Sequence, residues 1–574
     1  MSKLLLYLQP YRVLLALVMG LVFLQTLSEL YLPTLMADIV NFGVQYGNTP
    51  YILKMGGWML LVAAFGVCCT ILASYFSAKA ATGFGRDLRS TLFEHVMGFS
   101  QQEFDQLGTA SLITRTTNDV AQVQQVLMMT MRMMIVAPLM AIGGIVMALS
   151  KDAALALVII GIMPILGLAI YLIARKSVPL FKVMQRNLDQ LNLVQREGLT
   201  GIRVIRAFNR SGHEKRRFET ANRNLTATAL QVNRIMALMM PMMMLILNVS
   251  SLAIIWFGGI RVDQGHLQVG DLMAFLQYSM MILFSLIMLS MMFVMLPRAA
   301  ASAARIREVL ELAGTIHDAS VPEQAGCSGH VEFRNVTFRY PGAEQPVLEN
   351  ISFEAKPGEV TAIIGGTGSG KSTLVNLIPR FYDAESGRVL IDGVDVRELT
   401  QESLRKKIGF VPQKAVLFSG TIADNIRYGK EDATDEEVRH AAEVAQALEF
   451  ILEMEGGFDA PVAQGGANLS GGQKQRLSIA RALVRRPAIY VFDDSFSALD
   501  YKTDAQLRKA LKEETGHATV IIVAQRIHTV IDADRIVVLE NGRVAGIGTH
   551  QQLLQDNPVY QEIVASQLAE EESA

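Results

Sequence analysis

Residues 365–372 read Gly-Gly-Thr-Gly-Ser-Gly-Lys-Ser, between a β-branched run at Val360–Ile364 and a helical pattern from Thr373. Glycines in such a loop let backbone N–H groups converge on phosphate oxygens at the start of a helix, which itself favours anions. The lysine of this pattern reaches the β- and γ-phosphates, and the hydroxyl that follows it ligates Mg²⁺. The segment therefore predicts a site for ATP and Mg²⁺ made by Gly365, Gly366, Thr367, Gly368, Ser369, Gly370, Lys371, Ser372 and Thr373.

A second chemical signal is a pair of acids that follows the apolar run Ala488–Phe492. A buried strand that ends in Asp493 would deliver a carboxylate to nucleotide-bound Mg²⁺. Asp494 then occupies the position where an ATP-hydrolysing site of this type needs a general base. We expect Asp493 to hold metal and Asp494 to bear on whether this site hydrolyses ATP.

A second phosphate cradle is predicted at Leu469-Ser470-Gly471-Gly472-Gln473, which opens the helical pattern Lys474–Val484. A serine and two glycines at a helix start make an anion-binding surface. One nucleotide has no use for two such cradles in one domain. We therefore expect two domains to pair head to tail, so that Ser470, Gly471, Gly472 and Gln473 contact the ATP held by the partner domain.

The composition shows what kind of chain must position these residues. Of 574 residues, 51% are hydrophobic and only 18% are charged, where soluble domains carry about 25% charged residues. With a mean hydropathy of +0.30, the chain is predicted to lie partly in a membrane. Its net charge of -2 gives no basic bias for binding nucleic acid. Three cysteines form no disulfide framework and are expected to be free thiols: Cys68, Cys69 and Cys327.

Six apolar runs in the first half predict membrane-spanning helices, because lipid cannot satisfy free backbone groups. They are placed at about 13–36, 56–78, 127–149, 153–174, 237–260 and 272–296, each near the ~20 residues that cross a bilayer. The connections after the second and fourth runs are long and rich in lysine and arginine, whereas the opposite connections carry little positive charge. These long connections and both termini are therefore expected in the cytoplasm. We expect the long connections to be helical and to project below the membrane.

The second half has a different pattern. Residues 313–330 are turn-rich and lack an apolar period, which predicts a linker between a membrane domain at 1–312 and a second domain at 331–574. From Val331, short β-branched runs alternate with helical segments, which indicates an α/β domain with a largely parallel sheet. The fold class predicted is an α-helical transmembrane domain of six helices with long cytoplasmic extensions, followed by an α/β P-loop domain.

With these motifs in order, residues 331–560 resemble the nucleotide-binding domain of an ABC transporter, and nearly the whole chain resembles an ABC exporter half-transporter. The resemblance implies that Tyr340 stacks on adenine, although a strand-end tyrosine is the alternative. It implies that Gln413 contacts Mg²⁺ and faces the membrane domain, and that Asp500 lies in the loop that crosses between paired domains. Residues 102–119 and 198–208 resemble the two cytoplasmic coupling segments. The alternative for the second segment is a basic amphipathic helix.

Two positions depart from the family pattern. Asp494 replaces the usual glutamate, and its carboxylate reaches about 1.5 Å less far. Gln525 stands where a histidine normally contacts the γ-phosphate, and glutamine cannot take up a proton at neutral pH. His528 is expected to be an ordinary surface residue. Since both departures fall on the site built on this chain's own phosphate loop, the resemblance implies a heterodimeric bacterial exporter with a non-identical partner and a degenerate site here.

The membrane half offers candidate substrate residues. Glu29 and Arg132 lie within apparent spans, where ionisable groups are costly and often functional. Methionines cluster near residues 128–134, 236–244 and 288–295, which fits either a pocket for varied hydrophobic compounds or ordinary packing between helices and lipid. The preferred hypothesis is export of hydrophobic or amphipathic small molecules, of multidrug type, through the plasma (inner) membrane. Lipid, peptide or metal-chelate export and an ATP-sensing subunit without flux remain alternatives.

Overall fold

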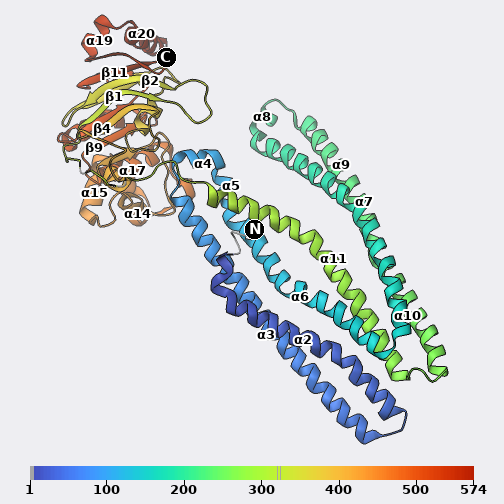
Figure 1. Ribbon diagram of the computed structural model, residues 1–574. Helices are drawn as coiled ribbons and strands as arrows, with labels where there is room; N and C mark the ends of the chain where they lie inside the picture. Colours follow the sequence, from blue (N-terminus) through green and yellow to red (C-terminus); the bar gives the residue numbers. More distant parts are fainter. Residues whose placement is uncertain (1–5, 320, 324, 574) are drawn as a thin grey trace. The chain divides into compact units, whose positions relative to one another are not determined.

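The computed structural model describes residues 6–319, 321–323 and 325–573, with the side chains of 290–294 and 568–573 left undescribed. The chain folds into two compact units (Figure 1). The first unit spans Met1–Met97 and Ala110–Glu311, and the second spans Gly98–Thr109 and Leu312–Ala574. The short segment Gly98–Thr109 thus packs with the second unit, although in sequence it lies inside the membrane half.

The first unit is helical throughout its described residues, apart from short turns between helices. Six of its helical stretches are long and apolar enough to cross a membrane, which confirms the predicted number of spans. Their helices, some continued by short π- or 3₁₀-turns, are α2 (Arg12–Asp38), α3 (Thr49–Met97), α5 (Thr109–Thr114), α6 (Val120–Lys151), α7 (Ala153–Thr200), α9 (Ser211–Ala237), α10 (Met239–Asp263) and α11 (Val269–Glu311), with α8 (Ile202–Ala207) between α7 and α9.

Several of these helices are much longer than a bilayer requires. The helix α3 has 49 residues and α7 has 48, whereas about 20 residues cross the hydrocarbon core. In Figure 1, α2 runs beside α3, and α7 runs beside α9. The extra turns follow the apolar stretches of α3 and α7, as expected for helical extensions beyond the membrane.

Ion pairs tie the helices of the first unit together at one end. Lys151 at the end of α6 pairs with Asp271 at 2.7 Å. The next residue, Asp152, begins α7 by accepting hydrogen bonds from the backbone N–H groups of Ala154 and Leu155, and its second oxygen lies 2.6 Å from Nε of Arg261. One acidic residue therefore both caps a helix and links α7 to α10.

At the other end of α6, the buried Asp119 joins α6 to α11. Its oxygens accept hydrogen bonds from the Ser302 hydroxyl and the Arg305 guanidinium, both at 2.8 Å. One turn away, Arg115 pairs with Glu308 at 2.9 Å. These contacts fix the register of α11 against α6.

The second unit contains two main sheets. A six-stranded sheet has the order β12-β11-β3-β10-β9-β6 and is parallel except for the edge strand β12, which confirms the predicted α/β class. A four-stranded antiparallel sheet has the order β2-β1-β4-β5. The strands are β1 (Val331–Phe338), β2 (Leu348–Ala355), β3 (Val360–Gly365), β4 (Ser386–Ile391), β5 (Val394–Asp395), β6 (Ile408–Val411), β7 (Gly420–Thr421), β8 (Pro461–Val462), β9 (Ile489–Asp493), β10 (Thr519–Val523), β11 (Arg535–Glu540) and β12 (Arg543–Gly548).

Helices surround these sheets and complete two apolar cores. They are α4 (Gln101–Leu107), α12 (Lys371–Asn376), α13 (Gln401–Lys406), α14 (Ile422–Arg427), α15 (Asp435–Val444), α16 (Leu448–Glu453), α17 (Gly471–Leu483), α18 (Tyr501–Glu514), α19 (His550–Asp556) and α20 (Pro558–Ser573). In β9, Tyr490 and Phe492 point into one core while Ile489 and Val491 point into the other. Because both faces of the central strands are buried, these strands are apolar at nearly every position rather than alternating.

Candidate functional site

The predicted phosphate loop connects β3 to α12, as the sequence required. Gly365 is buried, and a Cβ there would lie 2.2 Å from the carbonyl oxygen of Leu539. Gly368 and Gly370 adopt φ of +83° and +96°, which side chains rarely tolerate. Gly366, Thr367 and Gly368 form the exposed tip of the loop. The glycines are thus explained by close approach at the base of the loop and by backbone conformation at its turn.

Lys371 lies folded back under this loop. Its ammonium donates hydrogen bonds to the carbonyl oxygens of Gly365 and Gly366, each at 2.8 Å. Burial lowers the pKa of Lys371, against the opposing charges of Asp494 and Asp493. The buried hydroxyl of Ser369 has no hydrogen-bond partner among the described residues. A cation, exposed amides and an unused hydroxyl at one loop fit the oxygens of a nucleotide phosphate.

Asp493 ends β9 next to the first turn of α12. The hydroxyl of Ser372 donates to its Oδ1 at 2.9 Å. Burial and the neighbouring carboxylate of Asp494 raise the pKa of Asp493, while the Ser372 hydrogen bond lowers it. A hydroxyl and a carboxylate placed together are oxygen ligands of the kind that Mg²⁺ prefers. The pair therefore fits the predicted metal position.

Asp494 is held by two glutamines. Its Oδ2 accepts hydrogen bonds from Nε2 of Gln525 at 2.9 Å and from Nε2 of Gln413 at 3.1 Å. Its backbone has φ of +47°, a left-handed conformation that aspartate tolerates better than most residues. The structure thus brings both departures from the family pattern, Asp494 and Gln525, into direct contact. The resemblance predicted Gln413 at the metal, but it did not predict this hydrogen bond to Asp494.

Ser470, Gly471, Gly472 and Gln473 form the start of α17. The Ser470 hydroxyl accepts from the Gln473 N–H, and the Gln473 side chain accepts from the Ser470 N–H at 2.9 Å. This reciprocal capping box leaves the amides of the two glycines free. A Cβ on Gly471, which is exposed, would meet no atom within 4 Å. The segment therefore offers backbone donors at an open surface.

The two remaining nucleotide candidates lie on either side of these elements. Tyr340 is half-buried after β1, and its hydroxyl lies 3.1 Å from the hydroxyl of Thr373. Asp500 is exposed and begins α18 by accepting a hydrogen bond from the Thr503 N–H, which lowers the pKa of Asp500. Tyr340 thus lies beside the phosphate-loop helix, while Asp500 has a capping role whatever else it contacts.

An unexpected contact joins the short helix α4 to the aromatic residues near Tyr340. The hydroxyl of Tyr382 donates to Asp105 of α4 at 2.7 Å, and its ring packs edge-on against Tyr340 at 5.4 Å between centroids. Buried Glu103 of α4 accepts a hydrogen bond from the Thr315 N–H at 3.0 Å.

His528 differs from the sequence-based expectation. It is half-buried, and its Nε2 lies 3.5 Å from a carboxylate oxygen of the buried Asp504. The short turn Ile527–Thr529 folds the ring toward α18, where it also contacts Tyr501. The expectation of an ordinary surface histidine was therefore wrong.

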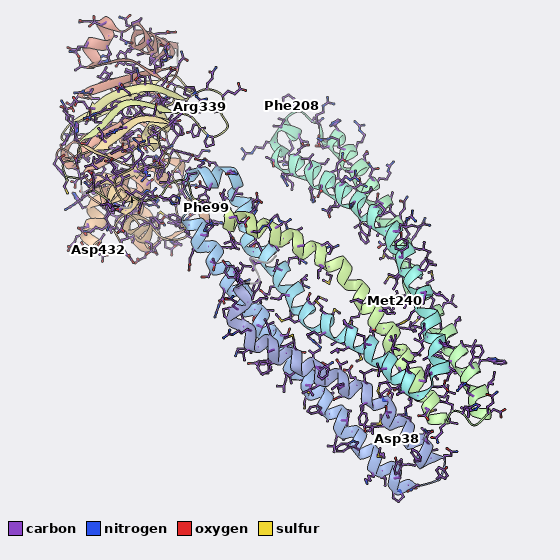
Figure 2. All side chains as sticks on the ribbon, viewed as in Figure 1. Asp38, Phe99, Phe208, Met240, Arg339 and Asp432 are labelled. Carbon is purple, nitrogen blue, oxygen red and sulfur yellow. The ribbon has the colours of Figure 1, made fainter. Side chains whose placement is uncertain are left out.

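Both substrate candidates of the membrane half line one cavity of about 1040 Å³ in the first unit. Glu29 comes from α2 and Arg132 from α6, with methionines around them that include Met240 of α10, labelled in Figure 2. Met128, Met129 and Met133 also line it, whereas the side chains of Met291 and Met292 lie outside the described residues. The cavity places the two ionisable residues and members of the methionine clusters in one site.

Comparisons with known proteins agree with this geometry. Residues 15–297 match the ABC transporter transmembrane region, and residues 348–497 match the ABC transporter family. The chain is 48% identical over 566 residues to an uncharacterized ABC transporter ATP-binding protein of Mycobacterium tuberculosis, covering 98% of this chain and 97% of the relative. It is 34% identical over 517 residues to an ATP-dependent lipid A-core flippase of Pseudomonas aeruginosa, covering 90% and 85%.

Among solved structures, a bacterial Atm1-family ABC exporter with ATP bound superposes with a TM-score of 0.80 at 28% identity, over 98% of both chains. The agreement extends through the membrane unit and the α/β unit alike. The chain therefore belongs to the ABC transporters, as an ATP-hydrolysing half-transporter of the exporter fold in which a six-helix membrane domain is fused to an ABC ATPase domain.

Proposed function

We propose that this chain is the degenerate-site subunit of a heterodimeric exporter that moves hydrophobic or amphipathic compounds out of the cytoplasm. Its phosphate loop binds ATP with little hydrolysis, and its Ser470–Gln473 segment completes the active site on a non-identical partner. Both termini and the ATPase domain lie on the cytoplasmic side of the inner membrane, because the long basic connections of the membrane half indicate that orientation.

The observation that supports the degenerate site most strongly is the double hydrogen bond to Asp494. A general base must offer its carboxylate to a water beside the γ-phosphate. Here Oδ2 of Asp494 accepts from the amides of Gln525 and Gln413, so this oxygen is already engaged. The side chain is also one methylene shorter than glutamate, and a misplacement of about 1 Å costs on the order of 100-fold in rate.

Oxygen ligands for a nucleotide-bound metal lie together beside the phosphate loop. Ser372, Asp493 and the free amide oxygen of Gln413 would hold Mg²⁺, which neutralises charge on the phosphates when bound. Lys371 would exchange its two carbonyl acceptors for phosphate oxygens, and the loop amides would complete the cradle. Tyr340 would support the adenine ring. These residues bind and orient ATP, but none of them supplies a well-placed base.

The partner-facing role follows from the open glycine amides at the start of α17. They are oriented by the capping box and unobstructed by atoms of this chain around Gly471. A partner's nucleotide could receive these donors where negative charge develops during hydrolysis. Asp500 lies in the loop proposed to cross between the paired domains.

The proposal is tested by purifying this chain alone and together with its partner and measuring ATP turnover in lipid. We expect slow turnover by the chain alone and rapid turnover by the pair. Replacing the catalytic glutamate of the partner should abolish the activity of the pair. Robust turnover by a homodimer, or full activity after the partner's glutamate is removed, would contradict the proposal.

Two alternatives retain specific support. Export of a lipid is favoured by the 34% identity to a protein described as an ATP-dependent lipid A-core flippase; peptide or metal-chelate cargo would use the same architecture. An ATP-sensing subunit without flux is favoured by the poor base alone. Vesicle transport with Glu29→Gln and Arg132→Ala separates them, since an altered substrate range supports a transport pocket and unchanged transport with altered nucleotide dependence supports the sensor.

A further inference from the structure

The large cavity of the first unit has an apolar body. Helices α2, α3, α6, α10 and α11 contribute to its wall, and methionines from three of them line it, among them Met128, Met240 and Met281. Its volume of about 1040 Å³ lies just above the usual range for small-molecule pockets, about 300–1,000 Å³. Flexible, polarizable thioethers can adapt to the apolar part of varied ligands.

The cavity has few polar residues, and some of them lack hydrogen-bond partners among the described residues. Gln25 donates to an oxygen of Glu29 at 2.9 Å, so this carboxylate already has one donor. Gln25 is only 7% exposed, and its amide oxygen has no partner among the described residues. Arg132 forms no hydrogen bond or ion pair with any residue that the structure describes. The cavity therefore contains an uncompensated guanidinium and an unused acceptor.

An arginine without a partner in a membrane span carries an energetic cost. Charged side chains within a membrane span are costly and usually pair with another group or face a water-filled space. Glu29 lines the same cavity but lies too far from Arg132 for an ion pair. A ligand anion would pair with the guanidinium through charge-assisted hydrogen bonds, which are about twice as strong as neutral ones. The free acceptor of Gln25 would take a hydroxyl or amine hydrogen of the same head group.

A second cavity of the same unit gives an internal contrast. It has about 730 Å³ and is lined by Leu27, Tyr31, Trp58 and Phe65 among other residues, and its described lining includes no charged side chain. Both cavities suit apolar chains, but only the first adds a guanidinium without a partner among the described residues. Charge complementarity therefore distinguishes the two.

We infer that the Arg132 cavity binds amphiphiles with an anionic head group, the guanidinium taking the anion, the Gln25 and Glu29 oxygens taking a neighbouring donor, and the methionines taking the apolar chain. This inference rests on the proposed export function and names its substrate class. A general hydrophobic pocket would not distinguish head groups, whereas this cavity should prefer an anionic head group among ligands with the same apolar chain.

The test uses the full chain in phosphatidylcholine nanodiscs without nucleotide, and three dansyl-labelled dodecyl probes with a phosphate monoester, a neutral amide or a trimethylammonium head. Binding is followed by fluorescence. We expect the phosphate probe to bind about 10-fold more tightly than the neutral one, because a charge-assisted hydrogen bond is gained. Arg132→Gln should remove this difference, and Arg132→Lys should keep part of it, because lysine retains the charge without the guanidinium fork.

Arg175→Gln is the matched control, since Arg175 is exposed on α7 and lines neither cavity. The neutral probe controls for folding of each variant, because its apolar contacts do not involve Arg132. Equal affinity for the phosphate and neutral probes, strongest binding of the ammonium probe, or no binding of any probe would overturn the inference. Because neither nucleotide nor partner is present, these outcomes leave the proposed degenerate site to be decided separately by turnover of the pair.

Discussion

The phosphate loop and the start of α17 are the two surfaces of one domain that we propose to bind phosphate, yet their side chains are organised in opposite ways. Around the phosphate loop, functional groups bind one another: Lys371 binds loop carbonyls, Ser372 binds Asp493, and Gln525 binds Asp494. At α17, the side chains of Ser470 and Gln473 bind the backbone of their own helix start and leave the glycine amides open. These arrangements are consistent with the two proposed roles, in which the phosphate loop holds ATP and the start of α17 offers backbone donors to the nucleotide of a partner.

This difference suggests how one domain can bind ATP at its own phosphate loop yet contribute mainly to hydrolysis of the ATP held by a partner. Binding at the phosphate loop requires only that its internal hydrogen bonds be exchanged for phosphate oxygens. Hydrolysis there would also require Asp494, whose Oδ2 is held by two glutamines, to reach a water molecule with its short side chain. At α17 no such rearrangement is needed, because preorganised backbone donors contribute to catalysis without moving. The variants below change one surface at a time.

The largest effect is expected for Gly471→Val at the start of α17. A Cβ at this position meets no atom of the described residues within 4 Å, so the domain should fold. The added side chain would occupy the space in front of the glycine amides. Turnover by the assembled transporter should fall by about 100-fold or more, the usual effect of losing an electrostatic donor.

Gly212→Val is the control for this variant, because Gly212 lies in the first turn of α9 and is equally unobstructed. It should leave turnover close to that of the unchanged transporter. Turnover is measured as phosphate release at saturating ATP. If Gly471→Val retained full activity, α17 would not face a working nucleotide site.

The next effect concerns Asp493, whose pKa is raised by burial and by Asp494. In Asp493→Asn, Mg²⁺-ATP affinity should fall by about 10- to 100-fold through loss of a charged ligand. The same variant should be more stable than the unchanged protein when no nucleotide is present. The pKa of Asp493 in the folded protein exceeds its unfolded value of about 3.9. The native protein therefore loses stability as pH rises from the unfolded pKa through the folded pKa, and asparagine, which does not ionise, removes this loss.

Asp392→Asn is a control with the opposite sign. Burial alone would raise the pKa of Asp392, but hydrogen bonds from Ser328, His330 and Gly329 and the charge of Lys407 hold it below the usual range. Its stabilisation is present at neutral pH and is lost as pH falls through the depressed pKa. Thermal melts of nucleotide-free protein at pH 8 should show Asp493→Asn more stable and Asp392→Asn less stable than the unchanged protein, and the loss for Asp392→Asn should shrink only when pH falls below the unfolded pKa of about 3.9. Equal behaviour of the two variants would contradict the assigned directions.

A smaller gain is expected from rebuilding the base. The double variant Asp494→Glu with Gln525→His supplies the longer carboxylate and a titratable partner. ATP turnover by this chain alone should rise by about 10-fold. The gain is limited because glutamate is less suited than aspartate to φ of +47°.

The two single variants are measured beside the double one, since residues in contact are not additive. Each single variant should raise ATP turnover by less than the double variant does. If the double variant showed no increase while still binding ATP, the distance between the carboxylate and the phosphate would not be what limits turnover.

Much of this arrangement was predictable because it depends on local sequence. The apolar runs Val360–Ile364 and Ala488–Phe492 placed β3 and β9 within one residue at each end, since strands buried on both faces must be continuously apolar. The six membrane spans and the capping residues of α17 could likewise be recognised from short stretches of sequence.

Contacts between distant residues were not predictable. The family resemblance placed Gln413, Gln525 and Asp494 at one nucleotide site, but it did not indicate that both amides would bind the same oxygen of Asp494. That contact depends on how β6, β9 and β10 align in the sheet. The same holds for Asp105 of α4, which meets Tyr382 across 277 positions of sequence. Glu29 and Arg132 were singled out by their cost in a membrane, but only the packing of α2 against α6 places them in one cavity.

The smallest effect is expected for Asp494→Asn, and it is the most demanding test of the contrast between the two surfaces. Asparagine has the same size, tolerates the left-handed conformation and keeps an oxygen that can accept from Gln525 or Gln413. It cannot act as a base. If this chain's own site mainly holds ATP, kcat/KM of the assembled transporter should change by no more than about twofold. A loss of about 100-fold, the scale of a missing general base, would instead show that Asp494 hydrolyses ATP despite its two amide partners, and the two surfaces would then belong to two working sites.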